Sequence, residues 1–396
     1  MKKLAILGPG VVGGSCAEIL LRDAAIIEKN AGERLELAYV LARHDMPGRS
    51  FRDKLTADFS VIEQDKDVFA VIETIGGCGA ALDMTRRALT AGKHVITANK
   101  QLVAEYGTQL LALAEAHGVN FLFEASVGGG IPVLHPLSQC LGANEIQEVR
   151  GILNGTTNYI LTQMLEFGQS YGAALKDAQA RGYAEQDPTA DVDGIDAGRK
   201  ICILADMMFG RSVDPSRVSI TGIRAITALD TAFAESAGMK LKLLGRAVRQ
   251  GSQLCVFVSP HFVAGAQPLA PIRGVLNAVE ALGSSVGAVM FSGPGAGGPA
   301  TASAVLGDVI DIVRNPGRRQ PVSWSAAPAA LFDPGAFPAS FFIRTRQDKS
   351  VCEQALGPIR WLPDQGESHG GFTAQTCKNA IAASGLTPDA VWPVLA

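Results

Sequence analysis

The chain has 396 residues, of which 47% are hydrophobic and 18% are charged, and its formal net charge is −3. This length and apolar content suffice for two or three folded domains and exclude a disordered chain. The absence of a long basic run argues against nucleic-acid binding, and the apolar runs are too interrupted for a membrane span. Seven scattered cysteines without a CxxC pair favour a reducing cytosol over a disulfide framework or a zinc site, so we expect a cytoplasmic protein.

A glycine-rich turn follows the first apolar stretch. Residues 3–7 predict a strand, the sequence GPGVVG fills residues 8–13, and a helical pattern continues to about Leu21. A GxGxxG motif between a strand and a helix is typical of dinucleotide binding, because it permits a tight turn, close approach of a pyrophosphate and close helix packing, with helical N–H groups facing the phosphates. An ordinary glycine-rich turn is the alternative. We expect coenzyme contacts at Gly8, Gly10, Val11, Val12 and Gly13.

The second predicted strand, residues 35–41, ends beside a charged segment. The residue after this strand normally contacts the coenzyme ribose, and Arg43 stands there with Arg49 nearby. An arginine at this place suits the 2′-phosphate of NADP, whereas an acid suits NAD. Arg43 therefore predicts NADP, while Asp45 keeps NAD open. Surface charge without a coenzyme role is the other interpretation.

Two further strands end in candidate ligand contacts. Residues 67–73 lead into Thr74, and residues 94–97 lead into Lys100. Ligands of parallel sheets bind at the carboxyl ends of the strands, so we expect both side chains at the coenzyme crevice. A plain surface lysine is the alternative for Lys100.

The predicted strand 119–124 leads into three consecutive glycines, 128–130. Glu124 and the carbonyl groups that follow it are a candidate site for a monovalent cation, since glycines let the backbone approach an ion closely. A hinge between domains explains the same residues equally well. From about residue 145 the sequence changes, and the segment 148–161 has a polar centre that leads into a helix.

Residues 181–200 combine carboxylates with a lysine. A helix is expected to begin near Gly194, which places Asp196 and Lys200 four residues apart on one helical face. This pattern suits a small substrate with an ammonium group next to an acid–base lysine, although a capped and solvated helix start explains the acids as well. A calcium loop is rejected, because Thr189 and Lys200 occupy ligand positions of the EF-hand pattern. The acids of the stretch are Glu185, Asp187, Asp191, Asp193 and Asp196.

The remaining chain predicts a second sheet and a tail. Segments near 216–227, 240–249 and 253–263 have strand patterns, and a second glycine loop at 291–299 precedes a helix at 301–314. The proline-rich residues 315–338 predict a linker. The strand predicted at 340–346 opens a small βαβ-like unit.

Together these motifs resemble the homoserine dehydrogenase family over about residues 3–315. The specific segments, in the family's order, are ETIGG at 73–77, ANK at 98–100, EASVGGGIP at 124–132, GILNGTTNYIL at 151–161, GYAEQDPTADVDG at 182–194, Asp196 with Lys200, and GPGAG at 293–297. The resemblance implies an α/β fold with a Rossmann-type dinucleotide-binding domain (1–135), an α+β substrate-binding and dimerisation domain (136–300), a helix returning to the first domain (301–318), and a linker with a small degenerate ACT-like tail (319–396).

The resemblance also implies NAD(P)-dependent interconversion of L-homoserine and L-aspartate 4-semialdehyde in threonine, methionine and isoleucine biosynthesis. Lys200 is then the acid–base residue, and Lys100 lies beside nicotinamide and substrate. A homodimer is implied, and no aspartate kinase domain is expected ahead of residue 1. Substrate contacts are expected from Glu185, Asp196, Asn154, Thr156 and Tyr183, a further coenzyme contact from Gly293, and a sodium site, mostly through backbone oxygens, from Glu124, Val127, Gly129 and Ile131.

Some features depart from the family or leave other functions open. Gly198 inside the expected helix start costs about 1 kcal/mol against Ala. The middle of the ACT-like tail is short and irregular, so we expect weak or absent inhibition by threonine. The competing functions are another amino-acid dehydrogenase on the same scaffold and a coenzyme-binding regulatory paralogue without turnover. The intact Lys100, Glu185, Asp196 and Lys200 argue against the paralogue.

Overall fold

The computed structural model describes residues 1–317, 322–363, 365 and 370–396. The chain forms two compact units, and each is described by itself. The first comprises Met1–Asn144, Ile203–Pro215 and Gly293–Pro328, and the second comprises Glu145–Cys202, Ser216–Ser292 and Ala329–Ala396. Both units are therefore assembled from segments that are distant in the sequence.

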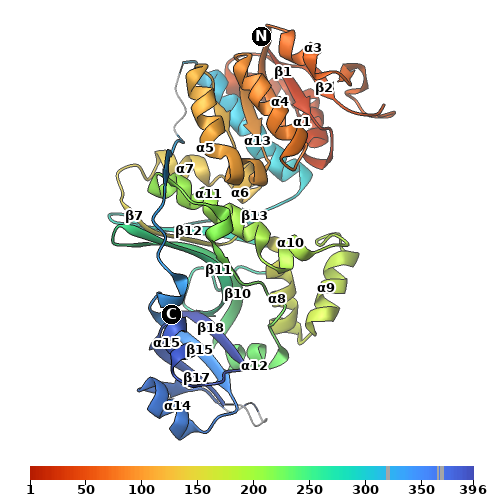
Figure 1. Ribbon diagram of the computed structural model, residues 1–396. Coiled ribbons are helices and arrows are strands. Elements are labelled where there is room, and N and C mark those ends of the chain that lie inside the picture. The colour runs from red at the N-terminus through yellow and green to blue at the C-terminus, as the bar shows by residue number, and fades with distance from the viewer. Residues whose placement is uncertain (318–321, 364, 366–369) are drawn as a thin grey trace. The chain divides into compact units, whose positions relative to one another are not determined.

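A six-stranded parallel sheet forms the centre of the first unit (Figure 1), with the strand order β3-β2-β1-β4-β5-β6. This is the order of dinucleotide-binding folds, in which the ligand binds where the order reverses, between β1 and β4. The predicted α/β fold with a Rossmann-type domain is therefore confirmed. The strands are β1 (Lys2–Leu7), β2 (Leu35–Leu41), β3 (Leu55–Thr56), β4 (Val68–Glu73), β5 (His94–Thr97) and β6 (Phe121–Leu122).

Helices connect and cover these strands. Helix α13 (Gly298–Arg314) lies beside α1 (Val11–Arg22), as Figure 1 shows, and both contribute to one apolar core with β1, β2 and β4. The chain thus returns to the first sheet after residue 298. The other elements of this unit are α2 (Ala24–Ala31), η1 (Arg52–Lys54), α3 (Phe59–Gln64), α4 (Gly79–Thr90), α5 (Lys100–Ala116), α6 (Ala125–Gly128), α7 (Leu134–Gln139), β8 (Arg211–Ser212) and β14 (Ser325–Pro328), the last two paired in parallel.

A ten-stranded sheet forms the second unit, with the order β13-β12-β7-β10-β11-β18-β15-β17-β16 and β9 paired to β11. Its longest pairing is the antiparallel hairpin of β10 (Met239–Gln250) and β11 (Gln253–Ala264). The remaining strands are β7 (Ile146–Ile152), β9 (Ser219–Ile220), β12 (Leu276–Gly283) and β13 (Gly287–Pro294), and the helical elements are α8 (Gly155–Phe167), α9 (Tyr171–Ala180), α10 (Thr189–Val192), α11 (Ile195–Phe209), η2 (Pro215–Arg217) and α12 (Ala228–Ser236).

The C-terminal segment extends this sheet. Its order β15-α14-β16-β17-α15-β18 and its strand order β18-β15-β17-β16 are those of a ferredoxin-like βαββαβ unit, with Phe341, Phe372 and Ile381 in its core. The segment is more regular than the irregular βαβ-like unit we expected, and residues 364 and 366–369 lie outside the described part. The elements are η3 (Pro334–Ala336), β15 (Ala339–Thr345), α14 (Lys349–Leu356), β16 (Ile359–Trp361), β17 (Gly370–Thr376), α15 (Lys378–Ala383) and β18 (Ala390–Leu395).

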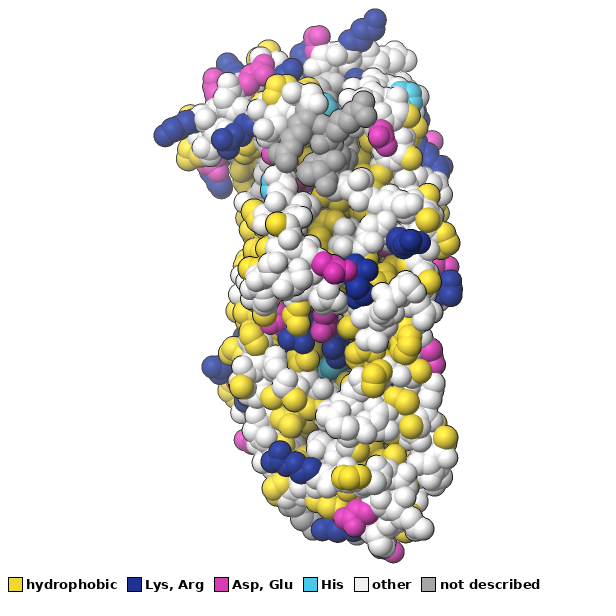
Figure 2. Space-filling view, turned by 90° about the vertical axis from the view of Figure 1, so that its left-hand side faces the viewer, with side chains coloured by type: hydrophobic (Ala, Val, Ile, Leu, Met, Phe, Trp, Pro, Cys, Tyr) yellow, Lys and Arg dark blue, Asp and Glu magenta, His cyan; other side chains and the backbone are white. Residues whose placement is uncertain are grey.

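The surface agrees with the low charge of the sequence. On the face drawn in Figure 2, the described Lys and Arg side chains are scattered and do not gather into one basic patch. Within the described ranges, no helix has both the length and the hydropathy that crossing a bilayer requires.

A buried ion pair ties the C-terminal strands to helix α12. Arg344 Nε lies 3.2 Å from Asp230 Oδ1, and both side chains are buried. Asp230 also accepts hydrogen bonds from the Thr227 N–H and hydroxyl, which completes a capping box at the start of α12. The carboxylate thus links the helix N-terminus to β15.

Replacing Arg344 by Met should lower the free energy of unfolding by about 3 kcal/mol, because it leaves the Asp230 carboxylate buried without its cation. Urea unfolding followed by circular dichroism measures the change. The control is Arg346→Met, since the Arg346 side chain is 70% exposed and its pairing with Asp389 is loose; there we expect less than about 0.5 kcal/mol. Equal losses in the two variants would contradict the assignment.

Candidate active site

The turn between β1 and α1 is shaped by its glycines. A Cβ atom added to Gly13 would lie 2.2 Å from the Gly8 carbonyl oxygen and 2.5 Å from Thr74 Oγ1, so no larger residue fits there. A Cβ on Gly10 would meet nothing within 4 Å, which leaves open space above the turn. Helix α1 begins at the exposed Val11 without a side-chain cap at Gly10, so its first N–H groups face this space. These residues fit the pyrophosphate of a dinucleotide.

Thr74 holds this turn against the end of β4. Its hydroxyl lies 2.7 Å from the Gly8 carbonyl oxygen and 3.0 Å from that of Leu7. A hydroxyl has one hydrogen to donate, so the turn uses it. The predicted coenzyme contact of Thr74 would therefore involve its methyl group or its backbone.

A buried acid organises the neighbouring strand ends. Glu73 is fully buried and accepts hydrogen bonds from the Ile75 N–H at 2.7 Å and the Thr97 hydroxyl at 2.6 Å. Burial raises the pKa of Glu73, and these hydrogen bonds oppose the shift. The carboxylate thereby fixes the turn after β4 to the end of β5. No role was predicted for Glu73, although an acid at the end of an apolar strand indicates a buried hydrogen-bonding group.

Asn99 extends this network to Lys100. Its amide nitrogen donates to the Gly77 carbonyl at 2.6 Å, and its amide oxygen caps α5 by accepting from the Leu102 N–H at 3.1 Å. Lys100 is the first residue of that helix. The position of Lys100 is therefore set by a capped helix that the turn at Gly77 holds in place.

The charged segment after β2 contains three arginines, of which Arg49 and Arg52 are in ion pairs. Asp45 binds Arg52 through two hydrogen bonds of 2.8 and 2.5 Å, and Arg49 pairs with Glu18 at 2.5 Å. Arg43 is exposed, and no ion pair of its guanidinium occurs among the described residues. Among the candidate ribose contacts Arg43, Asp45 and Arg49, Arg43 is therefore the cation that is available to bind a 2′-phosphate. The hydrogen bonds from Arg52 also lower the pKa of Asp45.

The second glycine loop packs against the turn region. A Cβ on Gly298 would lie 2.5 Å from Ser15 Oγ, and one on Gly129 would lie 2.2 Å from the Gly295 carbonyl oxygen. Gly293, a predicted coenzyme contact, lies against Ile131, whose Cγ1 a Cβ would approach to 3.3 Å. The loop after α6 and the loop before α13 thus touch each other closely.

The Glu124 carboxylate accepts hydrogen bonds from the backbone. Its two oxygens accept the N–H groups of Val133, Leu134 and His135 at 2.5, 2.8 and 2.7 Å, at the start of α7. Any cation here would be left with carbonyl oxygens, such as those of the predicted Val127, Gly129 and Ile131. Within the described ranges there is no cluster of three or more His, Cys, Asp or Glu side chains that could hold a metal ion.

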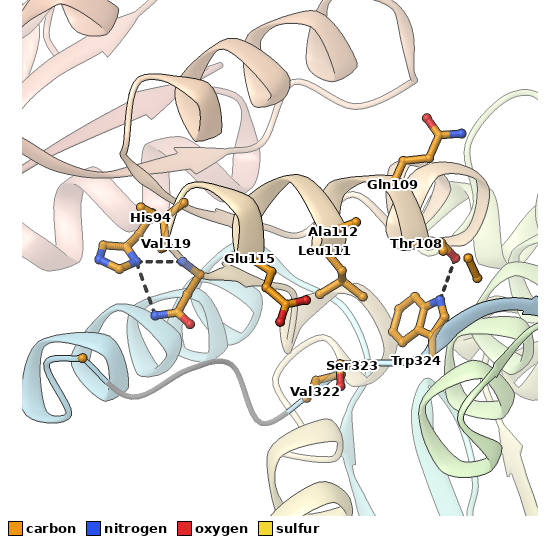
Figure 3. Close-up of a pocket in the computed structure, with 14 residues that line it drawn as sticks. His94, Thr108, Gln109, Leu111, Ala112, Glu115, Val119, Val322, Ser323 and Trp324 are labelled. Carbon is orange, nitrogen blue, oxygen red and sulfur yellow. Dashed lines mark hydrogen bonds between the residues drawn. The ribbon is translucent and has the colours of Figure 1, made fainter.

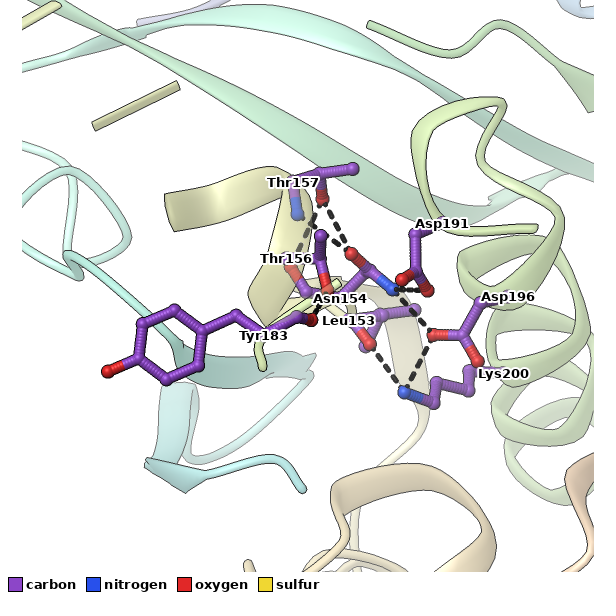
Figure 4. A network of polar contacts seen from close by, with 8 residues as sticks. All are labelled: Leu153, Asn154, Thr156, Thr157, Tyr183, Asp191, Asp196 and Lys200. Carbon is purple, nitrogen blue, oxygen red and sulfur yellow. Dashed lines mark hydrogen bonds and ion pairs between the residues drawn. The ribbon is translucent and has the colours of Figure 1, made fainter. Parts of the chain in front are cut away.

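In the second unit, Asp196 and Lys200 form the ion pair that their spacing predicted. Lys200 Nζ lies 2.9 Å from Asp196 Oδ2, with both side chains more than nine-tenths buried, and it donates to the Leu153 carbonyl at 2.7 Å (Figure 4). Helix α11 begins at Ile195, immediately after the predicted Gly194. The structure thus places an ammonium and a carboxylate at the buried end of β7.

Asn154 connects this pair to the acidic loop. Its amide nitrogen donates to Asp191 Oδ1 at 2.7 Å and to Asp196 Oδ2 at 3.0 Å, and its amide oxygen caps α8 by accepting from the Thr157 N–H at 2.9 Å (Figure 4). One residue therefore holds two carboxylates and a helix start. Asp191 was recognised only as an acid of the loop, because the contact joins residues 37 positions apart.

The other predicted substrate residues lie around this network. Thr156 Oγ1 donates to the Tyr183 carbonyl at 2.6 Å, while the Tyr183 ring points away from the network (Figure 4) and packs edge-on against Tyr159. Glu185 is exposed, and no ion pair of its carboxylate occurs in the described part of the chain. The structure therefore brings Asn154, Asp196 and Lys200 together and leaves the Glu185 carboxylate toward solvent.

The most spacious of the described cavities lies elsewhere. It measures about 710 Å³ and is lined by His94, Thr108 and Trp324 among others (Figure 3). His94 begins β5, so this cavity is at the amino edge of the sheet, opposite the carboxyl edge where ligands of such sheets bind. We assign no function to it.

Comparisons with known proteins cover most of the chain. Residues 8–124 match the family model for the NAD-binding domain of homoserine dehydrogenase, and residues 132–310 match the homoserine dehydrogenase model. The chain is 43% identical to a homoserine dehydrogenase of Synechocystis over 318 residues, which are 78% of this chain and 73% of the relative.

Solved structures agree with the sequence comparisons. A homoserine dehydrogenase from Thiobacillus denitrificans superposes with a TM-score of 0.90 at 32% identity, covering 99% of this chain and 98% of the other. A hyperthermophilic archaeal homoserine dehydrogenase in complex with NADPH superposes with a TM-score of 0.67 at 26% identity, covering 78% of this chain and 97% of that one.

Arg43→Ala should weaken NADPH binding about tenfold and leave NADH binding almost unchanged, because only NADPH carries the 2′-phosphate. Titration of coenzyme fluorescence measures both dissociation constants. The control is Arg49→Ala, which removes an arginine already paired with Glu18 and should have a smaller effect. Equal weakening of NADH and NADPH by Arg43→Ala would remove this hypothesis.

Proposed function

Because the chain belongs to the homoserine dehydrogenase family, we propose that it interconverts L-homoserine and L-aspartate 4-semialdehyde with Lys200 as the proton-transferring residue. The observation that carries the assignment is the buried Asp196–Lys200 pair held by Asn154. The reaction joins a hydride transfer to the transfer of one proton on the substrate oxygen. The alternatives of another amino-acid dehydrogenase and of an inactive paralogue have no support in the comparisons.

The coenzyme is NAD(P), and we propose that NADP is preferred. The nicotinamide coenzyme, when bound, supplies or accepts the hydride. The glycine turn at Gly8–Gly13 fits its pyrophosphate, and the exposed Arg43 supports recognition of a 2′-phosphate. The NADPH complex of the archaeal relative supports the same choice. The proposed further coenzyme contacts are Thr74, Lys100 and Gly293.

Lys200 suits the donation of a proton in the reducing direction. Its ammonium is held by two acceptors, the Asp196 carboxylate and the Leu153 carbonyl, which fix Nζ in place. As the aldehyde carbon receives the hydride, the ammonium donates a proton to the substrate oxygen, and the reverse reaction returns it. Asp196 orients the lysine, and Lys100 is the second candidate for the proton transfer.

Substrate binding uses the polar groups around this pair. The carboxylates of Glu185 and Asp196 are proposed to bind the substrate ammonium, with Asn154, Thr156 and Tyr183 completing the site. The exposed Glu185 carboxylate is available for that role. Asn154 acts mainly by positioning, since its amide already bridges Asp191 and Asp196.

Three further properties follow from the family resemblance. We propose a homodimer formed through the second unit. We also propose a sodium ion bound at Glu124, Val127, Gly129 and Ile131, mostly through backbone oxygens; the Glu124 carboxylate also anchors the start of α7. All seven cysteines are free thiols, which supports a reducing cytoplasm.

Lys200→Ala should lower turnover roughly 100-fold or more, the usual scale for a general acid–base group, with coenzyme affinity nearly unchanged. Absorbance at 340 nm with homoserine and NADP measures turnover. The control is Lys242→Met, which removes another buried lysine of the second unit, one hydrogen-bonded to Asn158 and the Ile272 carbonyl. A folded Lys200→Ala protein with near-normal turnover would make Lys100 the candidate.

Asp196→Ala should raise the Michaelis constant for homoserine and also lower turnover, because it removes a substrate contact and the partner that orients Lys200. The losses in the Lys200→Ala and Asp196→Ala single variants should not add in the double variant, since the residues act as a unit. A purely structural ion pair predicts lower stability in both single variants but ordinary kinetics in each. Kinetics and thermal unfolding of the three variants distinguish these outcomes.

Asn154→Ser should lower turnover about tenfold or more while leaving the melting temperature close to normal. Serine still caps α8 but is too short to bridge two carboxylates, so Asp196 and Lys200 lose their fixed position. Asn154→Ala, the matched variant, loses the cap as well and should also be less stable by about 1 kcal/mol. Normal turnover in Asn154→Ser would show that the bridge has no catalytic consequence.

A further inference from the structure

A small cavity lies beside the C-terminal module of the second unit, and neither Asp196 nor Lys200 lines it. It measures about 250 Å³ and is bounded by β9, β11, η3, β15 and the start of α15. Its volume is below the roughly 300–1,000 Å³ of sites for drug-sized ligands, so it excludes a dinucleotide and suits a small metabolite. The mechanism proposed above does not use it.

One cation lines this cavity. Lys378 is the first residue of α15, and neither a hydrogen bond nor an ion pair of its ammonium occurs among the residues that the structure describes. Burial alone lowers the pKa of Lys378, which means that no carboxylate offsets the loss of water around its charge. The side chain is half-buried, and a half-buried charge without a partner loses part of its hydration, which an anionic ligand would offset.

The acid that lines the same cavity is already bound. Asp333 accepts the Asn379 amide at 2.8 Å and the Gly335 N–H at 2.8 Å, and these hydrogen bonds lower its pKa. A Cβ on Gly335 would lie 2.3 Å from Asn379 Oδ1, so η3 and α15 are clasped closely together. This clasp fixes the residue next to Lys378 and keeps Asp333 from serving as the counter-ion of the lysine.

The neighbouring strands contribute a neutral histidine and hydrogen-bonding groups. His261, fully buried on β11, has its pKa lowered by burial first and then by the charges of Arg246, Lys378 and Arg150, so it stays neutral. Hydroxyl groups at the cavity come from Ser259, Thr221 and Ser219, while the rings of Phe257, Phe337 and Phe341 supply apolar walls.

We propose that this cavity binds a small aliphatic carboxylate, with the Lys378 ammonium as its charge partner, the hydroxyl groups as hydrogen-bond donors and the phenylalanine rings around its alkyl part. The ligand would bridge α15 of the C-terminal module to β9 and β11 of the large sheet. The geometry favours a carboxylate over a neutral molecule, because a neutral ligand would cover the half-buried ammonium without pairing its charge. The inference does not depend on the hydride-transfer reaction.

The test is isothermal titration of the full chain with sodium propionate and with propionamide, its uncharged counterpart. We expect saturable propionate binding and at least tenfold weaker binding of propionamide. Lys378→Met should weaken propionate binding at least tenfold, whereas Lys378→Arg should retain most of it. The matched control is Lys349→Met, which removes an exposed lysine of the same module.

Several results would overturn the proposal. Propionate that binds Lys378→Met as tightly as the wild type would show that the ligand is elsewhere, for example at the homoserine site. Equal binding of propionamide, no saturable binding of propionate, or saturation by inorganic phosphate in its place would each contradict the carboxylate assignment. Because Lys378→Met removes a half-buried charge and no described ion pair, we expect the variant to fold, and circular dichroism checks that it does. The Lys378→Arg variant keeps the positive charge, so it should retain most of the propionate binding that Lys378→Met loses.

Discussion

The ion pair between Asp196 and Lys200 is the interaction on which the proposed active site depends. Two charges that are more than nine-tenths buried are stable only if further hydrogen bonds satisfy them, since desolvation costs more than their attraction returns. The Leu153 carbonyl binds the ammonium and the Asn154 amide binds the carboxylate. The end of β7, the start of α8 and the first turns of α11 are thereby fixed relative to one another. A lysine held in this way is positioned for proton transfer before any substrate arrives.

In the first unit, the positions of the loops are set by close packing around glycines. Gly13 leaves no space for a side chain beside the Gly8 carbonyl, Gly129 is confined by the Gly295 backbone, and Gly298 by the Ser15 side chain. The open space above Gly10 follows from this close packing, because the backbone is drawn away from it. The networks of Glu73 and Asn99 then fix the strand ends that carry Thr74 and Lys100. Intramolecular hydrogen bonds of Glu73 and Asn99 thus hold the edge of the sheet at which we expect the coenzyme to bind.

The C-terminal module belongs structurally to the second unit. Strand β18 pairs in parallel with β11, so the βαββαβ segment continues the large sheet. The Asp230–Arg344 pair joins it to the rest of the unit at a further place. The cavity at Lys378 lies beside this junction, which is where a bound ligand would act on both parts.

The sequence by itself determined the local elements and the positions of the motifs. The GPGVVG turn, the helix beginning after Gly194 and the i, i+4 spacing of Asp196 and Lys200 all follow from contacts within a few residues. The regular ferredoxin-like order of the tail escaped prediction, because its short strands are stabilised by pairing with distant partners. Gly198 had only a helix-propensity cost in the sequence, whereas in the structure a Cβ there would press on Ile220 at 2.5 Å. Tertiary structure alone decided that Asn154 bridges Asp191 and Asp196, that Glu124 binds the start of α7, and that Arg49 pairs with Glu18 while Arg43 has no ion pair with any described residue. These contacts span from 9 to 42 positions in the sequence, and only the folded backbone brings their polar atoms within hydrogen-bonding distance.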